Sequence, residues 1–162
     1  MRPERAGKTT TMSQSLSKLF VHIIYHIKNK NAYIRKEEKN ELYSYIGKII
    51  KDLDSIPILI NGVENHVHIL CVMSKNIALS KLIEEIKKNS SRWIKKFGPH
   101  YSCFEWQGGY GGFSVSPSIC EKTKKYIENQ EERHKKISFQ EEYLLFLKEY
   151  GIDYNEKYLW TD

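Results

Sequence analysis

Cysteine pairs are absent from this chain. Its three cysteines (Cys71, Cys103 and Cys120) are far apart, odd in number and without a Cys-x-x-Cys pair. This spacing excludes a zinc knuckle and a disulfide framework. We therefore expect free thiols and a reducing, cytoplasmic location.

Long apolar runs are also missing. No stretch approaches the roughly 18 apolar residues of a membrane span, and the polar N-terminus lacks the apolar core of a signal peptide. Gly7 and Lys8 do not belong to a phosphate-binding loop, because Arg2 stands where that motif requires its first glycine. Internal repeats and low-complexity linkers are absent as well. These absences favour an ordinary globular domain.

Size and composition agree with that view. The chain has 162 residues, of which 40% are hydrophobic and 12% aromatic, enough for one domain with a normal core. Residues 1–15 are polar and basic, and we expect a disordered extension there, with a single domain over residues 16–162. The formal charge of +6 and the pI of about 9.1 favour a polyanionic partner, nucleic acid before membrane. The eleven tyrosines fit base stacking, a half-polar core or a dimer contact.

Hydrophobic periodicity predicts an α+β fold. Period-two and β-branched patterns predict strands over residues 19–27, 57–61, 64–74 and 104–116, the last interrupted by four glycines. Helical periodicity predicts helices over residues 36–53, 79–97, 117–135 and 139–150. Ser138 and Glu141 form a capping box for the last helix, which Gly151 ends. This order indicates a ferredoxin-like (split βαβ) antiparallel sheet, with helices on one face and the other face free for a ligand.

Two histidines share one face of a predicted strand. In the segment NHVHIL (residues 65–70), His66 and His68 are two residues apart and point the same way, while Val67 faces the helices. Neighbouring imidazoles on one face can bind one cation. The alternative is that both are hydrogen-bonded sheet histidines, and the pattern alone does not decide between them.

The predicted helix over residues 117–135 offers further polar groups. Tyr126 and Gln130 are four residues apart on one helical face, and His134 continues that face one turn later. If this helix docks across the open sheet, the Gln130 carbonyl oxygen completes the metal shell and the Tyr126 hydroxyl lies beside the metal. No cysteine or carboxylate is an obvious ligand. The alternative is a Tyr/Gln stripe that packs on the sheet.

Such a set of residues suits phosphodiester chemistry. A divalent cation on a phosphodiester oxygen polarises the phosphorus, and a tyrosine can then attack it. The resulting phosphotyrosine retains the bond energy, so the strand can be rejoined to another end without ATP. This logic favours DNA strand transfer over hydrolysis, for which water suffices.

Other residues are candidates for DNA contact. A basic helix face could bind phosphates, although such a face is usually only solvated. His22 and His26 share a face of the first strand, and either line the DNA-binding face or pack. Trp106 and Tyr110 either stack on bases or belong to the core. The basic face consists of Lys87, Lys88, Arg92, Lys95 and Lys96.

Seven segments in order resemble one family, the single-tyrosine HUH transposases of small bacterial insertion sequences and their relatives that act on repeated palindromes. The segments are MSQSLSKLFVHI, NHVHIL, KKNSSRWIKK, WQGGYGGFSVS, YIENQEERH, FQEEYLLFL and KYLW. The resemblance covers nearly the whole chain from Met12. It departs at His26, where relatives tend to have a small polar residue.

The resemblance implies a site and a reaction. His66 and His68 would bind the metal, Gln130 would be the third ligand, and Tyr126 would be the nucleophile. The cofactor would be Mg²⁺ or Mn²⁺, although two imidazoles alone also suit Zn²⁺ or a later transition metal. The substrate would be single-stranded DNA hairpins, cut and rejoined through a 5′-phosphotyrosine.

The resemblance also implies an assembly and a location. The protein would be an obligate homodimer whose active site is shared in trans, in the cytoplasm of a bacterium and associated with the nucleoid. Two other readings stay open from the residues: a hairpin-DNA-binding regulator that does not cut, and a metal-dependent nuclease.

Overall fold

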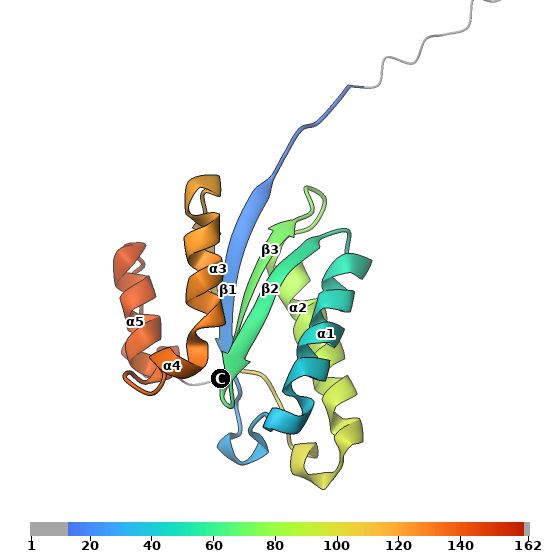
Figure 1. The fold of residues 1–162 in the computed structure, drawn as a ribbon, viewed down its shortest axis with the longest axis vertical. Helices are drawn as coiled ribbons and strands as arrows, with labels where there is room; N and C mark the ends of the chain where they lie inside the picture. Colours follow the sequence, from blue (N-terminus) through green and yellow to red (C-terminus); the bar gives the residue numbers. More distant parts are fainter. Residues whose placement is uncertain (1–12, 161–162) are drawn as a thin grey trace, which may run out of the picture.

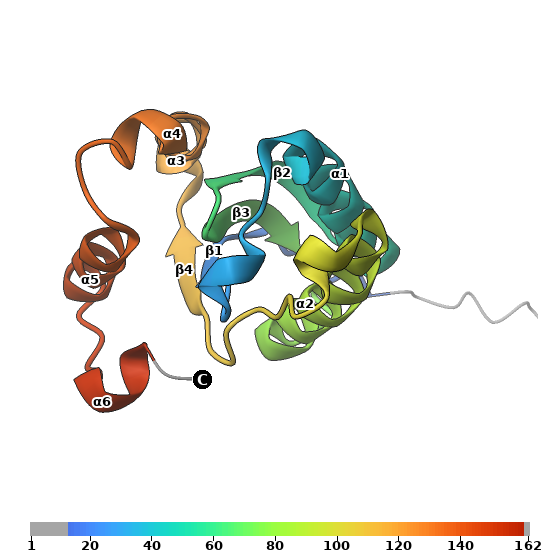
Figure 2. The ribbon, with the colours of Figure 1, turned by 90° about the horizontal axis from the view of Figure 1, so that it is seen from below.

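A four-stranded antiparallel sheet forms the centre of the molecule. The computed structural model describes residues 13–160, so most of the predicted disordered extension lies outside the described residues. The strand order β2-β3-β1-β4 confirms the predicted split βαβ arrangement (Figures 1 and 2). The strands are β1 (Leu19–His26), β2 (Ile56–Val63), β3 (His66–Met73) and β4 (Gly111–Val115).

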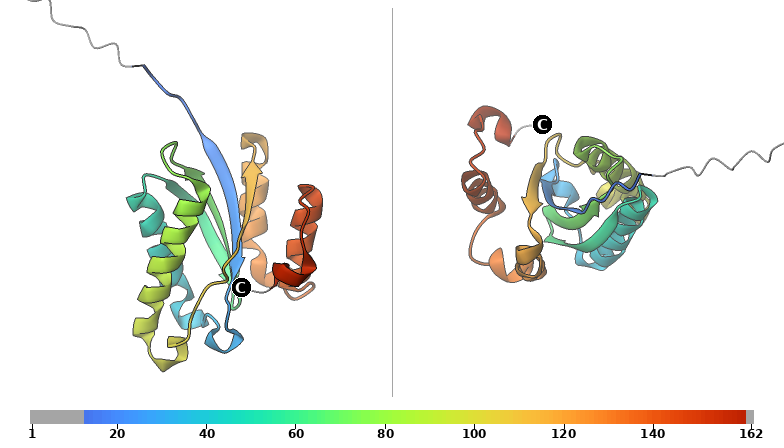
Figure 3. Two further views of the ribbon diagram at one scale, coloured as in Figure 1. Left: turned by 180° about the vertical axis from the view of Figure 1, so that it is seen from behind. Right: turned by 90° about the horizontal axis from the view of Figure 1, so that it is seen from above.

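Helices cover both faces of this sheet. Figures 2 and 3 show α1 and α2 on one side and α3, α4 and α5 on the other. The second face, predicted to be free for a ligand, is therefore covered by the chain's own C-terminal helices. None of the described helices is long and apolar enough to cross a membrane. The helices are α1 (Lys36–Asp52), α2 (Leu79–Ile94), α3 (Cys120–Glu128), α4 (Gln130–Arg133), α5 (Phe139–Glu149) and α6 (Glu156–Leu159), with short 3₁₀ turns at Lys30–Ala32, Lys95–Phe97, Pro99–Tyr101 and Pro117–Ile119.

Alternation along β1 divides the apolar residues between two layers. Val21, Ile23 and Tyr25 belong to the main core beneath α1 and α2, because successive side chains of a strand point to opposite faces. Ile24 points the other way, into a smaller cluster beneath α5. The α5 residues of this smaller cluster are Phe139, Tyr143 and Leu147.

Two predicted elements are shorter than expected. The helix predicted over residues 117–135 is divided at Asn129 into α3 and α4. The Asn61 side chain from β2 donates hydrogen bonds to the carbonyl oxygens of Ile127 (2.8 Å) and Glu128 (3.3 Å). These oxygens belong to the last turn of α3, where carbonyl groups lack helical partners. Of the strand predicted over residues 104–116, only β4 is formed. Trp106 makes only an isolated bridge with Ile27.

The Ser138 cap and the end of α5 before Gly151 are confirmed. The Ser138 hydroxyl accepts a hydrogen bond from the Glu141 backbone N–H at 3.1 Å, as expected of an N-cap residue. Gly151 follows the helix with φ +63°, a left-handed conformation that glycine adopts at little cost. These two residues fix the length of α5, and thereby which of its side chains reach the sheet.

Gly62 in β2 lies directly against the strand that carries the two histidines. A Cβ atom there would stand 2.2 Å from the His66 carbonyl oxygen and 3.0 Å from the Val67 Cα. Because both are backbone atoms, the strands would have to separate. We expect Gly62→Ala to lower the free energy of unfolding by about 1–3 kcal/mol, measured by thermal denaturation.

Gly47→Ala in α1 is the matched control for this substitution. Its nearest neighbours would be side-chain atoms at 3.8 Å or more, which is ordinary contact, and alanine favours a helix over glycine by about 0.5–1 kcal/mol. This variant should keep or raise the melting temperature. Equal melting temperatures for the two variants would contradict the predicted clash at Gly62.

Candidate active site

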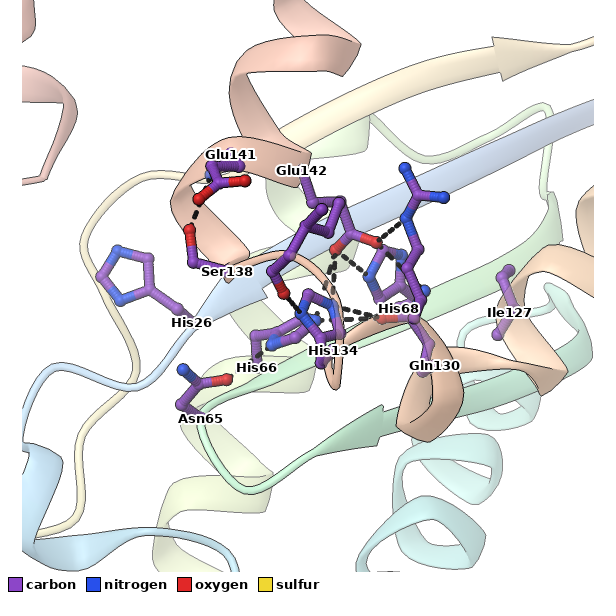
Figure 4. Close-up of polar contacts among 12 residues, drawn as sticks. His26, Asn65, His66, His68, Ile127, Gln130, His134, Ser138, Glu141 and Glu142 are labelled. Carbon is purple, nitrogen blue, oxygen red and sulfur yellow. Dashed lines mark hydrogen bonds and ion pairs between the residues drawn. The ribbon is translucent and has the colours of Figure 1, made fainter.

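Polar side chains from β3, α4 and α5 meet on the covered face of the sheet. His66 and His68 both point to this face, as predicted, and Val67 lies in the main core on the other side. Gln130 and His134 approach from the α4 segment and Glu142 from α5 (Figure 4). The side chains of His66, His68, Gln130 and Glu142 are all 0% exposed. The cluster is therefore closed to solvent in this conformation.

Two oxygen atoms face the imidazole nitrogens of this cluster. The Glu142 Oε1 atom lies 2.9 Å from His68 Nε2, 3.1 Å from His134 Nε2 and 3.4 Å from His66 Nε2. The Gln130 Oε1 atom lies 3.1 Å from His66 Nε2 and 3.0 Å from His134 Nε2. The ligand atoms of the three histidines and Glu142 lie within 4.8 Å of one another, so this group could hold a metal ion.

The outer nitrogen of each ring is held by a second group. His66 Nδ1 lies 2.6 Å from Asn65 Oδ1, and His68 Nδ1 lies 2.8 Å from His22 Nε2. His134 Nδ1 lies 3.0 Å from the backbone carbonyl of Ile137. Metal-binding histidines commonly use the outer nitrogen in this way, which orients the inner nitrogen toward the metal.

Burial sets the charges within the cluster. It lowers the pKa of His66 to about 4 and also lowers the pKa values of His68 and His22, so these rings are neutral at pH 7. Burial opposes ionisation of Glu142, but contacts with His134, His66 and His68 outweigh it and hold the pKa of its carboxyl well below the usual range. Neutral imidazoles beside an ionised carboxylate are the protonation states that metal binding requires.

Tyr126 lies at the edge of the cluster. Its hydroxyl donates a short hydrogen bond to Glu142 Oε2. The Arg133 guanidinium carbon lies 4.8 Å from the centre of the Tyr126 ring, and Arg133 Nε lies 3.2 Å from Glu142 Oε2. Burial, and then the Glu142 charge, raise the pKa of Tyr126, so it is a neutral phenol at pH 7.

Tyr126 can be reached from outside, unlike His66 and His68, which are 0% exposed. Its side chain lines two cavities of about 610 and 340 Å³, and Arg133 lines both. Lys136 lines the first cavity and Lys122 the second. A phosphate group could therefore approach Tyr126 along a basic route.

The tyrosine and the histidines come from one chain. Besides the hydrogen bonds of Asn61 to the end of α3, Lys39 Nζ in α1 lies 2.8 Å from Glu131 Oε1 in α4. These contacts fix Tyr126 and Gln130 over their own sheet. In this single chain, α3 and α4 therefore find specific partners on their own chain. The predicted sharing of the site between subunits stays a prediction. The homodimer itself stays a prediction.

The two other strand histidines have different surroundings. His22 is 2% exposed and supports His68 from behind, which makes it part of the cluster. His26 lies at the end of β1 with its ring edge against Phe139, and lines a cavity of about 540 Å³. Contact with DNA stays a prediction for both.

The aromatic candidates also differ from each other. Trp106 is 6% exposed, and its indole N–H donates a hydrogen bond to Ser90 Oγ at 2.9 Å. This placement favours the alternative of core packing over base stacking, because the ring offers no free face. Tyr110 is 37% exposed.

Helix α2, which carries most of the predicted basic face, lies on the opposite side of the sheet from α3, α4 and α5 (Figure 2). Lys87 Nζ donates hydrogen bonds to the carbonyl oxygens of Gln107 and Gly109, so it fixes the loop before β4. Lys88 pairs with Glu85 at 3.0 Å. Arg92, Lys95 and Lys96 are exposed. Phosphate contacts by these residues stay a prediction and would require DNA to extend round the domain.

Sequence reasoning missed Glu142 and Arg133. It found no obvious carboxylate for the site, whereas the structure places one at its centre. The capping residue was the one sequence feature that bears on Glu142. Ser138 starts α5, which places Glu142 in the first turn of that helix, eight residues after His134. Nothing in that spacing shows that α5 docks on the sheet.

The fold and the site define a class, an α+β domain in which a buried histidine pair on a central strand faces a tyrosine and a glutamine from the following helices. The family described as "Transposase IS200 like" matches residues 15–130, well over half of the chain, and the chain belongs to it. It is thus a member of a DNA transposase family. Comparison with curated proteins found no match.

Two solved structures share the fold. A transposase from Deinococcus radiodurans R1 has 20% sequence identity and a TM-score of 0.57, covering 74% of this chain and 98% of that chain. A REP-associated tyrosine transposase bound to a REP hairpin has 15% identity and a TM-score of 0.56, covering 76% of this chain and 74% of that chain. At these identities the likeness extends to the fold alone.

Proposed function

We propose that this protein cleaves and rejoins single-stranded DNA at hairpin-forming ends, with Tyr126 as the nucleophile. The observation that carries the proposal is the Tyr126 hydroxyl beside a buried cluster of His66, His68, Gln130 and Glu142. Membership of a transposase family supports it, and a related fold has been solved with a REP hairpin bound.

Each residue around Tyr126 has a place in this reaction. The phenolic oxygen would bond to the phosphorus, and the bond from phosphorus to the 3′ oxygen would break, leaving a 5′-phosphotyrosine. Glu142 Oε2 already accepts the hydrogen bond of the hydroxyl, so it is the nearest acceptor for the proton lost on attack. The departing 3′ oxygen would take a proton from water. The Arg133 guanidinium, beside the ring, suits the negative charge that develops on the phosphate.

The donor atoms fit a divalent cation. His66, His68 and Gln130 would hold Mg²⁺ or Mn²⁺, since an amide oxygen is a ligand that suits these ions. Once bound, the cation would polarise the phosphodiester and neutralise charge on it. The chain's own contribution is to keep the rings neutral by burial and to orient them through Asn65 and His22.

A regulator that binds DNA hairpins without cutting them is the second candidate. One observation favours it: the complete burial of His66, His68 and Gln130, which keeps a phosphate away from them in this conformation. Cleavage would require α5 to move, whereas simple hairpin binding would not.

A denaturing gel with a labelled hairpin oligonucleotide and a divalent cation separates these functions. We expect a covalent protein–DNA adduct that survives denaturation, because the 5′-phosphotyrosine is a covalent bond. Released fragments without an adduct would instead indicate a metal-dependent nuclease. A shift in a native gel with neither product would indicate the regulator.

A further inference from the structure

A carboxylate from outside the matched family segment lies at the centre of the histidine cluster. Glu142 belongs to α5, beyond residue 130 where the family match ends. Its side chain is 0% exposed, and burial of a carboxylate is unfavourable unless positive charge compensates it. Arg133 Nε lies 3.2 Å from Oε2. The other oxygen, Oε1, faces imidazole nitrogens.

The His134 ring directs one nitrogen atom at two oxygen atoms of this centre. Its Nδ1 faces the Ile137 carbonyl oxygen, which can only accept, so Nδ1 carries the ring proton. Its Nε2 lies close to two oxygen atoms, Gln130 Oε1 at 3.0 Å and Glu142 Oε1 at 3.1 Å. The ligand atoms of His66, His68, His134 and Glu142 lie within 4.8 Å of one another, so one cation between them could contact all four.

We propose that His134 and Glu142 are ligands of the same metal ion as His66 and His68, and that the bound ion fastens α5 to the sheet. Three imidazoles with a carboxylate form a donor set for a divalent transition metal. The ligands come from β3, from the end of α4 and from α5, so one ion would join three elements. The inference shares its metal site with the proposed function, but binding can be measured without DNA.

The second carboxylate oxygen of Glu142 links the proposed metal site to the Tyr126 hydroxyl. Oε1 faces the histidines while Oε2 accepts the hydrogen bond of Tyr126. A carboxylate bound to the ion through Oε1 would therefore hold the Tyr126 hydroxyl at a fixed place beside it. Glu142 is in this respect a positioning residue as well as a ligand.

Titration calorimetry with Mn²⁺ alone tests the inference on the full chain after treatment with a chelator. Glu142→Gln keeps the shape and removes the charge. Loss of a second-sphere partner alone typically weakens metal binding by about 10–100-fold, so loss of a ligand should raise the Mn²⁺ Kd at least tenfold. His134→Ala should act in the same direction. Glu141→Gln, one residue away and exposed, is the matched control and should leave the Kd unchanged.

Amide hydrogen exchange measures whether metal binding holds α5 against the sheet. Mn²⁺ should slow amide exchange in α5 of the wild-type protein and of Glu141→Gln, but not of Glu142→Gln. Mn²⁺ binding to Glu142→Gln and His134→Ala with the wild-type Kd would overturn the inference. So would equal protection of α5 with and without Mn²⁺ in the wild-type protein.

Circular dichroism confirms folding, and His134→Ala tests the site independently if Glu142→Gln does not fold. Failure of the DNA chemistry alone would leave these results unchanged.

Discussion

Tyr126→Phe is expected to abolish the covalent adduct while leaving the fold and hairpin binding intact. The ring keeps its contacts with His68 and Phe146, and only the oxygen that attacks phosphorus is lost. Loss of a nucleophile lowers the rate on the order of 10³-fold or more, so no adduct should appear on the denaturing gel. Native gels with the same hairpin should show wild-type affinity.

The stability of this variant should change little. Glu142 would lose one hydrogen bond but keep the hydrogen bond from Gln130 Nε2 and the ion pair with Arg133, at a cost of about 1–2 kcal/mol and a few degrees in melting temperature. Tyr150→Phe is the matched control, since Tyr150 lines one of the same cavities and donates a hydrogen bond to the Ser114 carbonyl. An adduct at wild-type yield from Tyr126→Phe would exclude Tyr126 as the nucleophile.

His66→Ala should also eliminate cleavage, and mixing it with Tyr126→Phe should not restore it. The distances that join His66 to Gln130 and Glu142 lie within one chain, so each subunit needs both residues intact. We expect each variant to lose activity on the order of 10³-fold or more, and the mixture to remain inactive on the denaturing gel. EDTA should inactivate the wild-type protein, and Mg²⁺ or Mn²⁺ should restore it.

The mixing experiment can be interpreted only if exchange of subunits between the two variants is demonstrated. Two affinity tags followed by co-purification would establish that mixed dimers form, if the protein dimerises. Recovery of activity in such dimers would mean that the tyrosine of one subunit serves the histidines of the other, as the sequence resemblance implied. His100→Ala, on an exposed contact with the Tyr33 carbonyl, controls for nonspecific effects of removing a histidine.

Local periodicity was sufficient to predict much of the site. The two-residue period of β3 places His66 and His68 on one face. The four-residue spacing of Tyr126 and Gln130 brings both to that face even though the helix is divided between them. These predictions depend only on backbone geometry within one element, which the sequence specifies directly.

Contacts between elements could not be predicted in the same way. Asn61 meets the end of α3 from a strand 66 residues earlier, and no local pattern announces the division at Asn129. Glu142 reads as an ordinary residue in the first turn of a helix, where acidic residues are common. Only the docking of α5 on the sheet turns it into the centre of the cluster, and docking depends on packing across the whole domain.

The smaller cluster beneath α5 shares no residue with the main core, and this separation sets the energetics of access. Segments with their own packing open as units, at free energies below that of global unfolding. We therefore expect that α5 can detach while the sheet, α1 and α2 stay folded. Because the histidines are covered in the closed state, DNA would engage them only in the open fraction of molecules. The apparent affinity of that step is the intrinsic affinity reduced by the open fraction, so packing at Phe139, Tyr143 and Leu147 would regulate the reaction.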